Sequence, residues 1–234
     1  CDTREMTPGC LFVALPGYKT DGHRYIRQAL ERGAAAVLCQ RPPEGEGPWL
    51  VTEDTRAALA IASANWFGHP ARELTLLAVT GTNGKTTTTS MATHIFMEAG
   101  ADPTVMIGGT LPLFHSGYHV GHGDTIILES CEYCNSFLCF FPTVAVILNV
   151  EADHLDFFKD LTDIQRSFRK FAELVPADTG WTVANYDNES THTALSGYDK
   201  RLFWFSLHAS DADCHAENIS WKDGLPSFDI LIHG

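Results

Sequence analysis

One short segment constrains the fold of this chain more than any other, the glycine-rich run of residues 80–87, Thr-Gly-Thr-Asn-Gly-Lys-Thr-Thr. It follows an apolar, strand-like run over residues 74–80 and precedes a predicted helix over residues 86–99. A glycine-rich turn between a strand and a helix points several backbone N–H groups at one anion, and the positive end of the helix adds to them. The segment therefore predicts a nucleotide-phosphate site.

Each part of this loop has an expected role. Lys85 supplies a positive charge for the β- and γ-phosphates, and the Thr86 hydroxyl is an expected Mg²⁺ ligand. Val79 stands where the strict pattern has glycine, so the loop is a variant, and the alternative is an ordinary strand–helix turn. We expect the nucleotide to contact the whole loop, which consists of Gly81, Thr82, Asn83, Gly84, Lys85, Thr86 and Thr87.

Two further polar motifs follow apolar strand-like runs. Glu129 follows the run over residues 125–128, and a carboxylate at the carboxyl end of a parallel strand faces the crevice where ligands bind. Asn149 and His154 follow the run over residues 144–148. Because Mg²⁺ takes one or two carboxylates together with phosphate oxygens, Glu129 is an expected ligand, and His154 is a candidate for a second metal or a phosphate. The alternative for each is a solvated polar residue.

Composition narrows the class of partner. The chain has 234 residues, and 16 Lys+Arg against 29 Asp+Glu give a net charge of −13. Such a balance argues against a general nucleic-acid binder or a binder of anionic membranes. The most apolar run, residues 137–150, is too short to span a membrane, and from the polar residues 1–4 we expect no signal peptide. With seven cysteines, an odd number, we expect free thiols in a reducing cytoplasm.

Strand-like runs alternate with helical periodicity along the chain, which predicts an α/β fold with a mostly parallel sheet flanked by helices. The break at residues 68–70 divides a small α/β domain, residues 1–70, from a larger domain with the expected nucleotide-phosphate site, residues 71–234. In the second domain we expect a helix over residues 162–174. Thr162 and Gln165 would form its capping box, and the apolar residues Ile164, Phe168, Phe171 and Val175 would share one face.

These motifs, in this order, resemble the Mur ligases, a family that builds the peptide stem of bacterial peptidoglycan by ATP-dependent amide-bond formation. The resemblance covers most of the chain, and it includes the family's ATP loop at residues 80–87 and its Asn-x-x-x-Asp-His-x-Asp motif at residues 149–156. The central part looks most like the branch that joins L-alanine to UDP-N-acetylmuramate, except that Cys131 and Cys134 replace acids; the segments concerned are residues 107–109 and 129–138. The first domain is instead similar to the UDP-binding domain of the tripeptide synthetases, in residues 2–4, 8–17 and 21–23.

The resemblance implies a reaction in which ATP phosphorylates a carboxylate of a UDP-N-acetylmuramyl substrate and an amino acid then displaces the phosphate. It implies ATP and Mg²⁺ as cofactors, with Lys85, Glu129 and His154 as catalytic residues and Asn149 beside the nucleotide. Thr86, Glu129 and His154 would hold the metal. Thr3 and Arg4 would lie near the uridine. A third, C-terminal domain of the family is expected to lie outside these 234 residues.

Several alternatives stay open. The chain is an ATP-dependent acid–amino-acid ligase, a Mur-like nucleotide-binding protein without ligase activity, or a ligase of the folylpolyglutamate type. The thiols of Cys131, Cys134 and Cys139 fit no common zinc module, and we expect them to be free. A loop rich in histidine, with His115, His119 and His122, contacts the substrate or is simply exposed.

Overall fold

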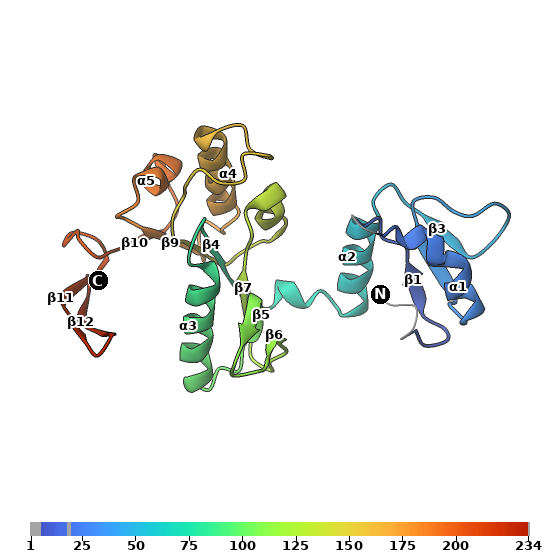
Figure 1. The fold of residues 1–234 in the computed structure, drawn as a ribbon, viewed down its shortest axis with the longest axis horizontal. Coiled ribbons are helices and arrows are strands. Elements are labelled where there is room, and N and C mark those ends of the chain that lie inside the picture. Colours follow the sequence, from blue (N-terminus) through green and yellow to red (C-terminus); the bar gives the residue numbers. More distant parts are fainter. Residues whose placement is uncertain (1–5, 18–19, 234) are drawn as a thin grey trace. The chain divides into compact units, whose positions relative to one another are not determined.

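The computed structural model describes residues 6–17 and 20–233, and the chain divides into two compact units, Cys1–Arg72 and Glu73–Gly234. Each unit has its own sheet, so each is described by itself (Figure 1). No helix within the described part of the chain combines the length and apolar character needed to cross a membrane.

The first unit is built on a three-stranded parallel sheet in the order β1-β2-β3. Its core consists of small and branched apolar side chains together with an aromatic ring, among them Phe12, Ile26 and Val37. The helix α2 begins after Asp54, whose carboxylate accepts hydrogen bonds from the backbone N–H groups of Arg56 and Ala57, as its N-cap position predicts. The elements of this unit are β1 (Leu11–Val13), a 3₁₀ turn (Gly22–Tyr25), α1 (Ile26–Glu31), β2 (Ala36–Cys39), β3 (Trp49–Val51), α2 (Thr55–Trp66) and a second 3₁₀ turn (Pro70–Arg72).

The second unit contains a nine-stranded sheet in the order β12-β11-β10-β9-β8-β4-β7-β5-β6. Its pairs are parallel except at the two edges, where β5 pairs with β6 and β11 pairs with β12 in antiparallel fashion. The α/β class with a mostly parallel sheet is therefore confirmed. Its strands are β4 (Thr75–Thr80), β5 (Thr104–Leu111), β6 (Ser116–His119), β7 (Thr125–Glu129), β8 (Val144–Ile147), β9 (Trp181–Asn185), β10 (Leu202–Ser206), β11 (Cys214–Lys222) and β12 (Leu225–Ile232).

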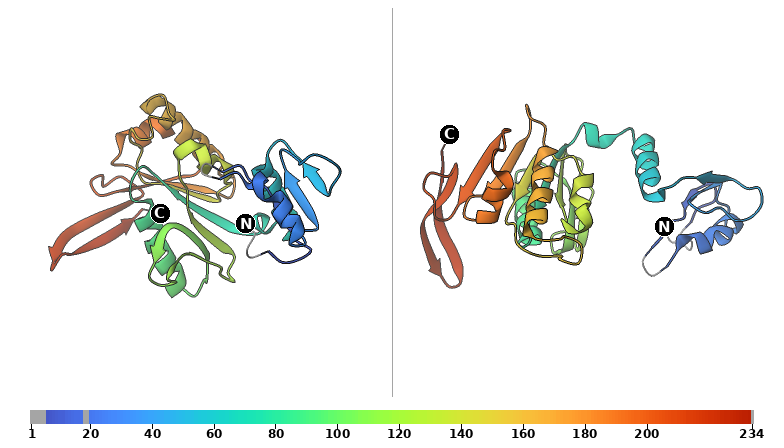
Figure 2. Two further views of the ribbon diagram at one scale, coloured as in Figure 1. Left: turned by 45° about the vertical axis from the view of Figure 1, so that its right-hand side comes forward. Right: turned by 90° about the horizontal axis from the view of Figure 1, so that it is seen from above.

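Helices cover both faces of this sheet. Figure 2 shows α3 on one side, and α4 with α5 on the other. The bounds are α3 (Lys85–Glu98), a 3₁₀ segment (Tyr133–Cys139), α4 (Leu161–Glu173) and α5 (Glu189–Leu195). The main core lies beneath α4, where Phe168 and Phe171 pack against Phe137 with ring centroids 5.3 and 4.8 Å away.

The start of α4 differs from the prediction. The apolar face expected for this helix is buried as predicted. The capping box of Thr162 and Gln165 is wrong, because the N-cap is Asp160, whose carboxylate accepts a hydrogen bond from the backbone N–H of Asp163. Asp160 lies two residues earlier and offers a charged acceptor to the same end of the helix, so it takes the capping position.

The edge strand β12 is exposed along its whole length. It forms a long hairpin with β11 that extends away from the helices of its own unit (Figure 2). Apolar side chains on this strand face solvent, including Leu225, Phe228, Ile230 and Ile232.

Candidate functional site

Three neighbouring strands bring their carboxyl ends to one edge of the large sheet. The central strand β4 pairs with β7 on one side and with β8 on the other, so that Val79 lies opposite Glu129 and Thr80 opposite Ile147. The glycine-rich loop follows β4, Glu129 is the last residue of β7, and Asn149 lies just after β8. The parallel register thus gathers residues that lie far apart in the sequence.

The loop turns sharply into α3. Gly84 is the N-cap of this helix and adopts a left-handed backbone with φ 84°, which a residue with a side chain rarely adopts. The first N–H groups of a helix have no partner within the helix, and here they open into a cavity of about 290 Å³. The cavity is lined by Thr82, Asn83, Gly84, Lys85, Thr86, Thr87 and Glu129.

Lys85 is held by oxygens of three residues. Its Nζ donates to the Gly81 carbonyl at 2.7 Å, to the Thr82 carbonyl at 3.4 Å and to Glu132 Oε1 at 3.3 Å. The second carboxylate oxygen, Oε2, lies 3.1 Å from Nζ in the same ion pair. Glu132 is 2% exposed, so its carboxylate contacts protein groups rather than solvent. His154 Nε2 lies 3.7 Å from the other oxygen, Oε1, of the same carboxylate.

Glu132 is a site residue that the sequence patterns did not single out. It lies 47 positions after Lys85, and only the fold brings the two charges together. A signal was present, because Glu132 belongs to the same acidic motif as Glu129, at the end of a strand beside the loop. The structure therefore groups Lys85, Glu132 and His154 in one charged cluster.

Glu129 lies in a second cluster, with Thr86. The Thr86 hydroxyl donates to Glu129 Oε2 at 2.9 Å, and the backbone N–H of Gly108 donates to the same oxygen at 2.8 Å. A Cβ atom at position 108 would lie 3.1 Å from both oxygens of Glu129, so the close approach of the β5 backbone favours glycine there.

Asn149 supports the loop from the end of β8. Its side-chain oxygen accepts from the backbone N–H of Asn83 at 2.8 Å, and its amide nitrogen donates to the Asn83 carbonyl at 3.0 Å. Two residues on, the backbone N–H of Glu151 donates to the Thr82 hydroxyl at 3.0 Å. Both polar atoms of the Asn149 side chain thus fix the shape of the loop.

Tyr133 and Asp156 close the side of the site next to His154. The Tyr133 hydroxyl donates to Asp156 Oδ2 at 2.9 Å, and this bond to a carboxylate raises the pKa of Tyr133 to about 12. The ring centroids of Tyr133 and His154 are 4.7 Å apart. The phenol therefore stays protonated at neutral pH and limits the position of the imidazole.

The donor set can be compared with the needs of Mg²⁺. No group of three or more His, Cys, Asp or Glu side chains in the described residues is arranged to hold a metal ion. Mg²⁺ keeps several waters and is commonly held by one or two carboxylates plus phosphate oxygens. The adjacent hydroxyl and carboxylate oxygens of Thr86 and Glu129 fit that mode of binding.

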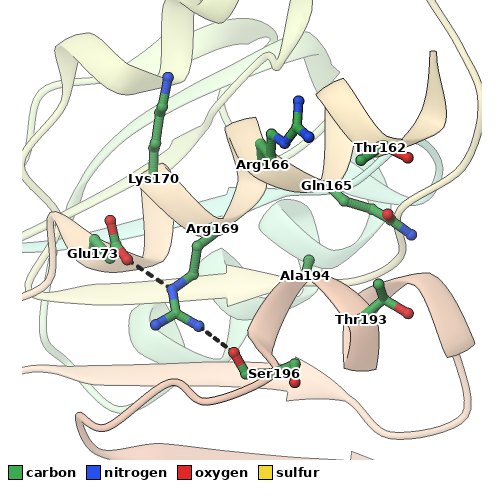
Figure 3. A pocket seen from close by; sticks show the side chains of 9 residues that line it. All are labelled: Thr162, Gln165, Arg166, Arg169, Lys170, Glu173, Thr193, Ala194 and Ser196. Atoms are coloured by element: carbon green, nitrogen blue, oxygen red, sulfur yellow. Dashed lines mark hydrogen bonds and ion pairs between the residues drawn. The ribbon is translucent and has the colours of Figure 1, made fainter.

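Another cavity, of about 520 Å³, lies between α4 and α5, and Figure 3 shows Arg169 reaching across it toward Ser196. Arg169 Nε donates to Glu173 at 2.8 Å, and its terminal nitrogens donate to the carbonyls of Ser196 and Gly197 at 2.8 and 3.2 Å. The guanidinium also lies over the Tyr198 ring, 5.2 Å from its centroid. Arg169 therefore ties α4 to the segment that follows α5.

The residues expected near the uridine, Thr3 and Arg4, lie outside the described residues. Further along the first unit, Asp21 caps the turn that follows β1 and accepts from the backbone N–H of His23 at 3.0 Å. This bond, the His23 ring at 2.6 Å and Arg41 lower the pKa of Asp21 to about 2. The His23 Nε2 accepts a hydrogen bond from the backbone N–H of Gln40 at 3.0 Å, which ties this turn to the segment after β2.

Two other expectations concern cysteine and histidine. The described cysteines are free, and three of them are exposed at the surface, namely Cys131, Cys134 and Cys139. The region with three histidines is not simply a loop, because His119 lies on β6. Its ring and that of His122 both contact the carboxylate of Asp102, at 2.8 and 3.0 Å.

Comparisons with known proteins agree on one family. Residues 79–233 match the description "Mur ligase middle domain", and residues 1–73 match "Mur ligase family, catalytic domain". The chain is 44% identical over 154 residues to the UDP-N-acetylmuramate–L-alanine ligase of Clostridium novyi, a match that covers 66% of this chain and 33% of that protein. The chain thus spans about a third of the length of this relative.

Solved structures show the same fold at lower identity. MurF from Acinetobacter baumannii superposes with a TM-score of 0.79 at 23% identity, covering 99% of this chain and 52% of that one. MurF ligase from Thermotoga maritima, solved in complex with ADP, gives 0.78 at 22% identity and covers 98% of this chain and 54% of that one. The fold of both units is therefore known from ligases that are roughly twice as long as this chain.

Proposed function

The chain belongs to the Mur ligase family, and we propose that it forms the ATP- and substrate-binding part of a ligase that joins an amino acid to a UDP-N-acetylmuramyl precursor of peptidoglycan. The observation that carries the proposal is the cavity of about 290 Å³ at the start of α3, with Lys85 at its wall. The name of the Clostridium novyi relative supports the substrate class, and the ADP in the Thermotoga maritima structure supports the nucleotide.

In this function Lys85 binds the phosphates of ATP. Its partner in the structure is Glu132, so a phosphate oxygen replaces a carboxylate oxygen at the same ammonium group. Charge then develops on the phosphoryl group as it moves to the substrate carboxylate. A positive charge fixed beside it lowers the barrier, because the ammonium group is already oriented before the charge develops. The amine of the amino acid then displaces phosphate from the acyl phosphate.

Thr86 and Glu129 would hold one Mg²⁺, and His154 would help to hold another. The ions would neutralise charge on the transferred phosphoryl group. The hydrogen bond from the Thr86 hydroxyl to Glu129 keeps both oxygens beside the loop. Asn149 keeps the loop open beside them through its two bonds to Asn83.

The first unit would bind the uridine part of the substrate, with Thr3 and Arg4 beside it. Shortly after Thr3 and Arg4 in the sequence, residues 7–11 line a cavity of about 560 Å³ together with Trp66 and Phe67. The free thiols and the negative net charge agree with a cytoplasmic protein that binds no nucleic acid.

Titration calorimetry with Mg²⁺-ADP tests the central claim on the chain itself. Lys85→Ala should weaken binding by about 10- to 100-fold, because a charge-assisted contact contributes about 1.5–3 kcal/mol. The matched control is Lys170→Ala, which removes a lysine of α4 and should leave the affinity unchanged. Equal affinities for wild type and Lys85→Ala would exclude the loop as the phosphate site.

Addition of UDP-N-acetylmuramate to the nucleotide-loaded chain tests the substrate class. A second binding event that a folate substrate does not reproduce supports the Mur reaction over the folylpolyglutamate alternative. Binding of folate in place of the uridine compound would instead favour that alternative.

A further inference from the structure

In the sequence Cys131-Glu132-Tyr133-Cys134, one cysteine precedes and the other follows two residues of the site. Glu132 belongs to the charged cluster, and Tyr133 contacts it. Glu132 is the ion-pair partner of Lys85, and the Tyr133 ring contacts His154. Both cysteines are free and exposed, whereas Glu132 between them is buried. A Cys-x-x-Cys pair after a strand of a parallel sheet is a pattern typical of thiol–disulfide exchange.

The backbone is compatible with a bridge between the two thiols. Glu132 has φ −74° and ψ −23°, and Tyr133 opens a 3₁₀ segment, so both central residues of the turn are helical. A turn of this kind brings its first and fourth Cα atoms within about 7 Å, the range in which disulfides form. Both thiols are also accessible from solvent to a small reactant.

The turn is held firmly on its C-terminal side. The backbone N–H of Phe137 donates to the Cys131 carbonyl at 3.0 Å, and the N–H of Asn135 donates to the Glu132 carbonyl at 3.0 Å. Cys134 and Asn135 both adopt left-handed backbones, with φ 54° and 56°, which are costly for residues other than glycine. A covalent link across such a turn would restrain Glu132 more than it would restrain a flexible loop.

We propose that Cys131 and Cys134 are a redox modification site, at which exchange with a low-molecular-weight disulfide forms an intramolecular bridge that weakens nucleotide binding. In the first step one cysteine sulfur displaces a thiol from the small disulfide and forms a mixed disulfide. In the second step the other cysteine displaces the second thiol. The two cysteines lose two hydrogens and two electrons, and these leave in two molecules of reduced thiol.

The effect on the nucleotide rests on the proposed function, in which a phosphate takes the place of Glu132 at Lys85. Glu132 must move aside for this exchange, because its carboxylate lies 3.1 Å from the ammonium group. A bridged turn restrains that movement, and the affinity for Mg²⁺-ADP is expected to fall about tenfold.

The bridge is tested with oxidised glutathione on the 234-residue chain carrying Cys139→Ser. This background removes a third exposed thiol that is close in the sequence. Peptide mass mapping should show that the peptide with both cysteines loses two hydrogens and carries no glutathione, and dithiothreitol should reverse the change. Adding Cys134→Ser to the background should instead leave a glutathione adduct on Cys131. Stable adducts on both cysteines, without a bridge, would overturn the proposal.

Calorimetry with Mg²⁺-ADP tests the consequence. The oxidised chain should bind about tenfold more weakly than the reduced chain, and the variant that also carries Cys131→Ser should show no such change after the same treatment. Equal affinities of the bridged and reduced chains would refute the effect on the nucleotide. If the bridge forms but the reduced chain binds no nucleotide, the proposed function is wrong while the modification site itself still stands. The two failures can therefore be told apart.

Discussion

Replacing Glu132 by glutamine separates the cost of losing a buried charge from the benefit of freeing Lys85. The two side chains are 3% and 14% exposed, and the closest oxygen and nitrogen lie 3.1 Å apart. Removing one partner of a buried pair costs about 3–5 kcal/mol, and a hydrogen bond to a charged group contributes about 1.5–3 kcal/mol. Glutamine keeps the shape of the side chain and an acceptor oxygen. We therefore expect the free energy of unfolding to fall by about 2 kcal/mol, which lowers the Tm of this unit by about 4–8 °C.

The same substitution should strengthen nucleotide binding. In the wild type a phosphate must displace a carboxylate from Lys85, whereas in Glu132→Gln it displaces only a neutral amide. If the nucleotide complexes of the variant and the wild type are equally stable, the loss of about 2 kcal/mol is confined to the free protein. The affinity for ADP then rises about 30-fold. Thermal unfolding with and without saturating ADP should therefore show a lower Tm for the free variant and a larger shift on binding.

Glu173→Gln is the matched control. Glu173 pairs with Arg169 at 2.8 Å, but its side chain is 51% exposed, and exposed pairs of this spacing contribute only about 0.3–0.5 kcal/mol. The control should keep the wild-type Tm and the wild-type shift with ADP. Competition between Glu132 and phosphate for Lys85 is ruled out if Glu132→Gln behaves in both respects like this control.

Three other predictions concern the metal, the core and acid stability. Glu129→Ala and His154→Ala should each raise the Mg²⁺ concentration needed for half-maximal ADP binding without weakening the binding of UDP-N-acetylmuramate; unchanged Mg²⁺ titrations would remove both residues from the metal site. Phe168→Ala should lower the free energy of unfolding by about 3–5 kcal/mol in urea titrations, because the ring is fully buried, and a loss under about 1 kcal/mol would contradict the packing. The fold lowers the pKa of Asp21 from 3.8 to about 2, which means that the folded state favours the ionised carboxylate. This contribution to stability is therefore complete above pH 3.8 and is lost as the pH falls toward 2. Asp21→Asn should flatten the pH dependence of the first unit's Tm in that window, and an unaltered profile would count against the contact with His23.

Helices and strands could be predicted from the sequence where apolar residues recur at regular spacing and the run ends at a clear capping or turn residue. In α4, apolar residues three and four positions apart predicted the buried face, and Ile164, Phe168 and Phe171 lie in the core. The strands β5 and β6 were not predicted, because Gly108 and Gly109 interrupt the apolar pattern there. The helix α5 was not predicted either, since it is only seven residues long and rich in Ser, Thr and His, weak helix formers that depend on packing.

The site could be predicted only where its parts are contiguous in sequence. The glycine-rich loop could be recognised as one segment, and its neighbours in the sheet could be expected at the same edge. The pairing of Lys85 with Glu132 and the bonds of Asn149 to Asn83 join residues 47 and 66 positions apart. Such contacts depend on strand order and register, which local patterns do not encode.

The exposed strand β12 has a consequence for how the 234-residue chain behaves in concentrated solution. An edge strand offers a row of free N–H and C=O groups, and proteins usually protect such edges with charges, bulges or proline. Within β12 the protection is slight, with Pro226 near one end and Asp229 as the single charged residue. The chain is therefore expected to aggregate by edge-to-edge strand pairing as its concentration rises, so colloidal stability, rather than folding, sets the upper limit for titrations and crystallisation.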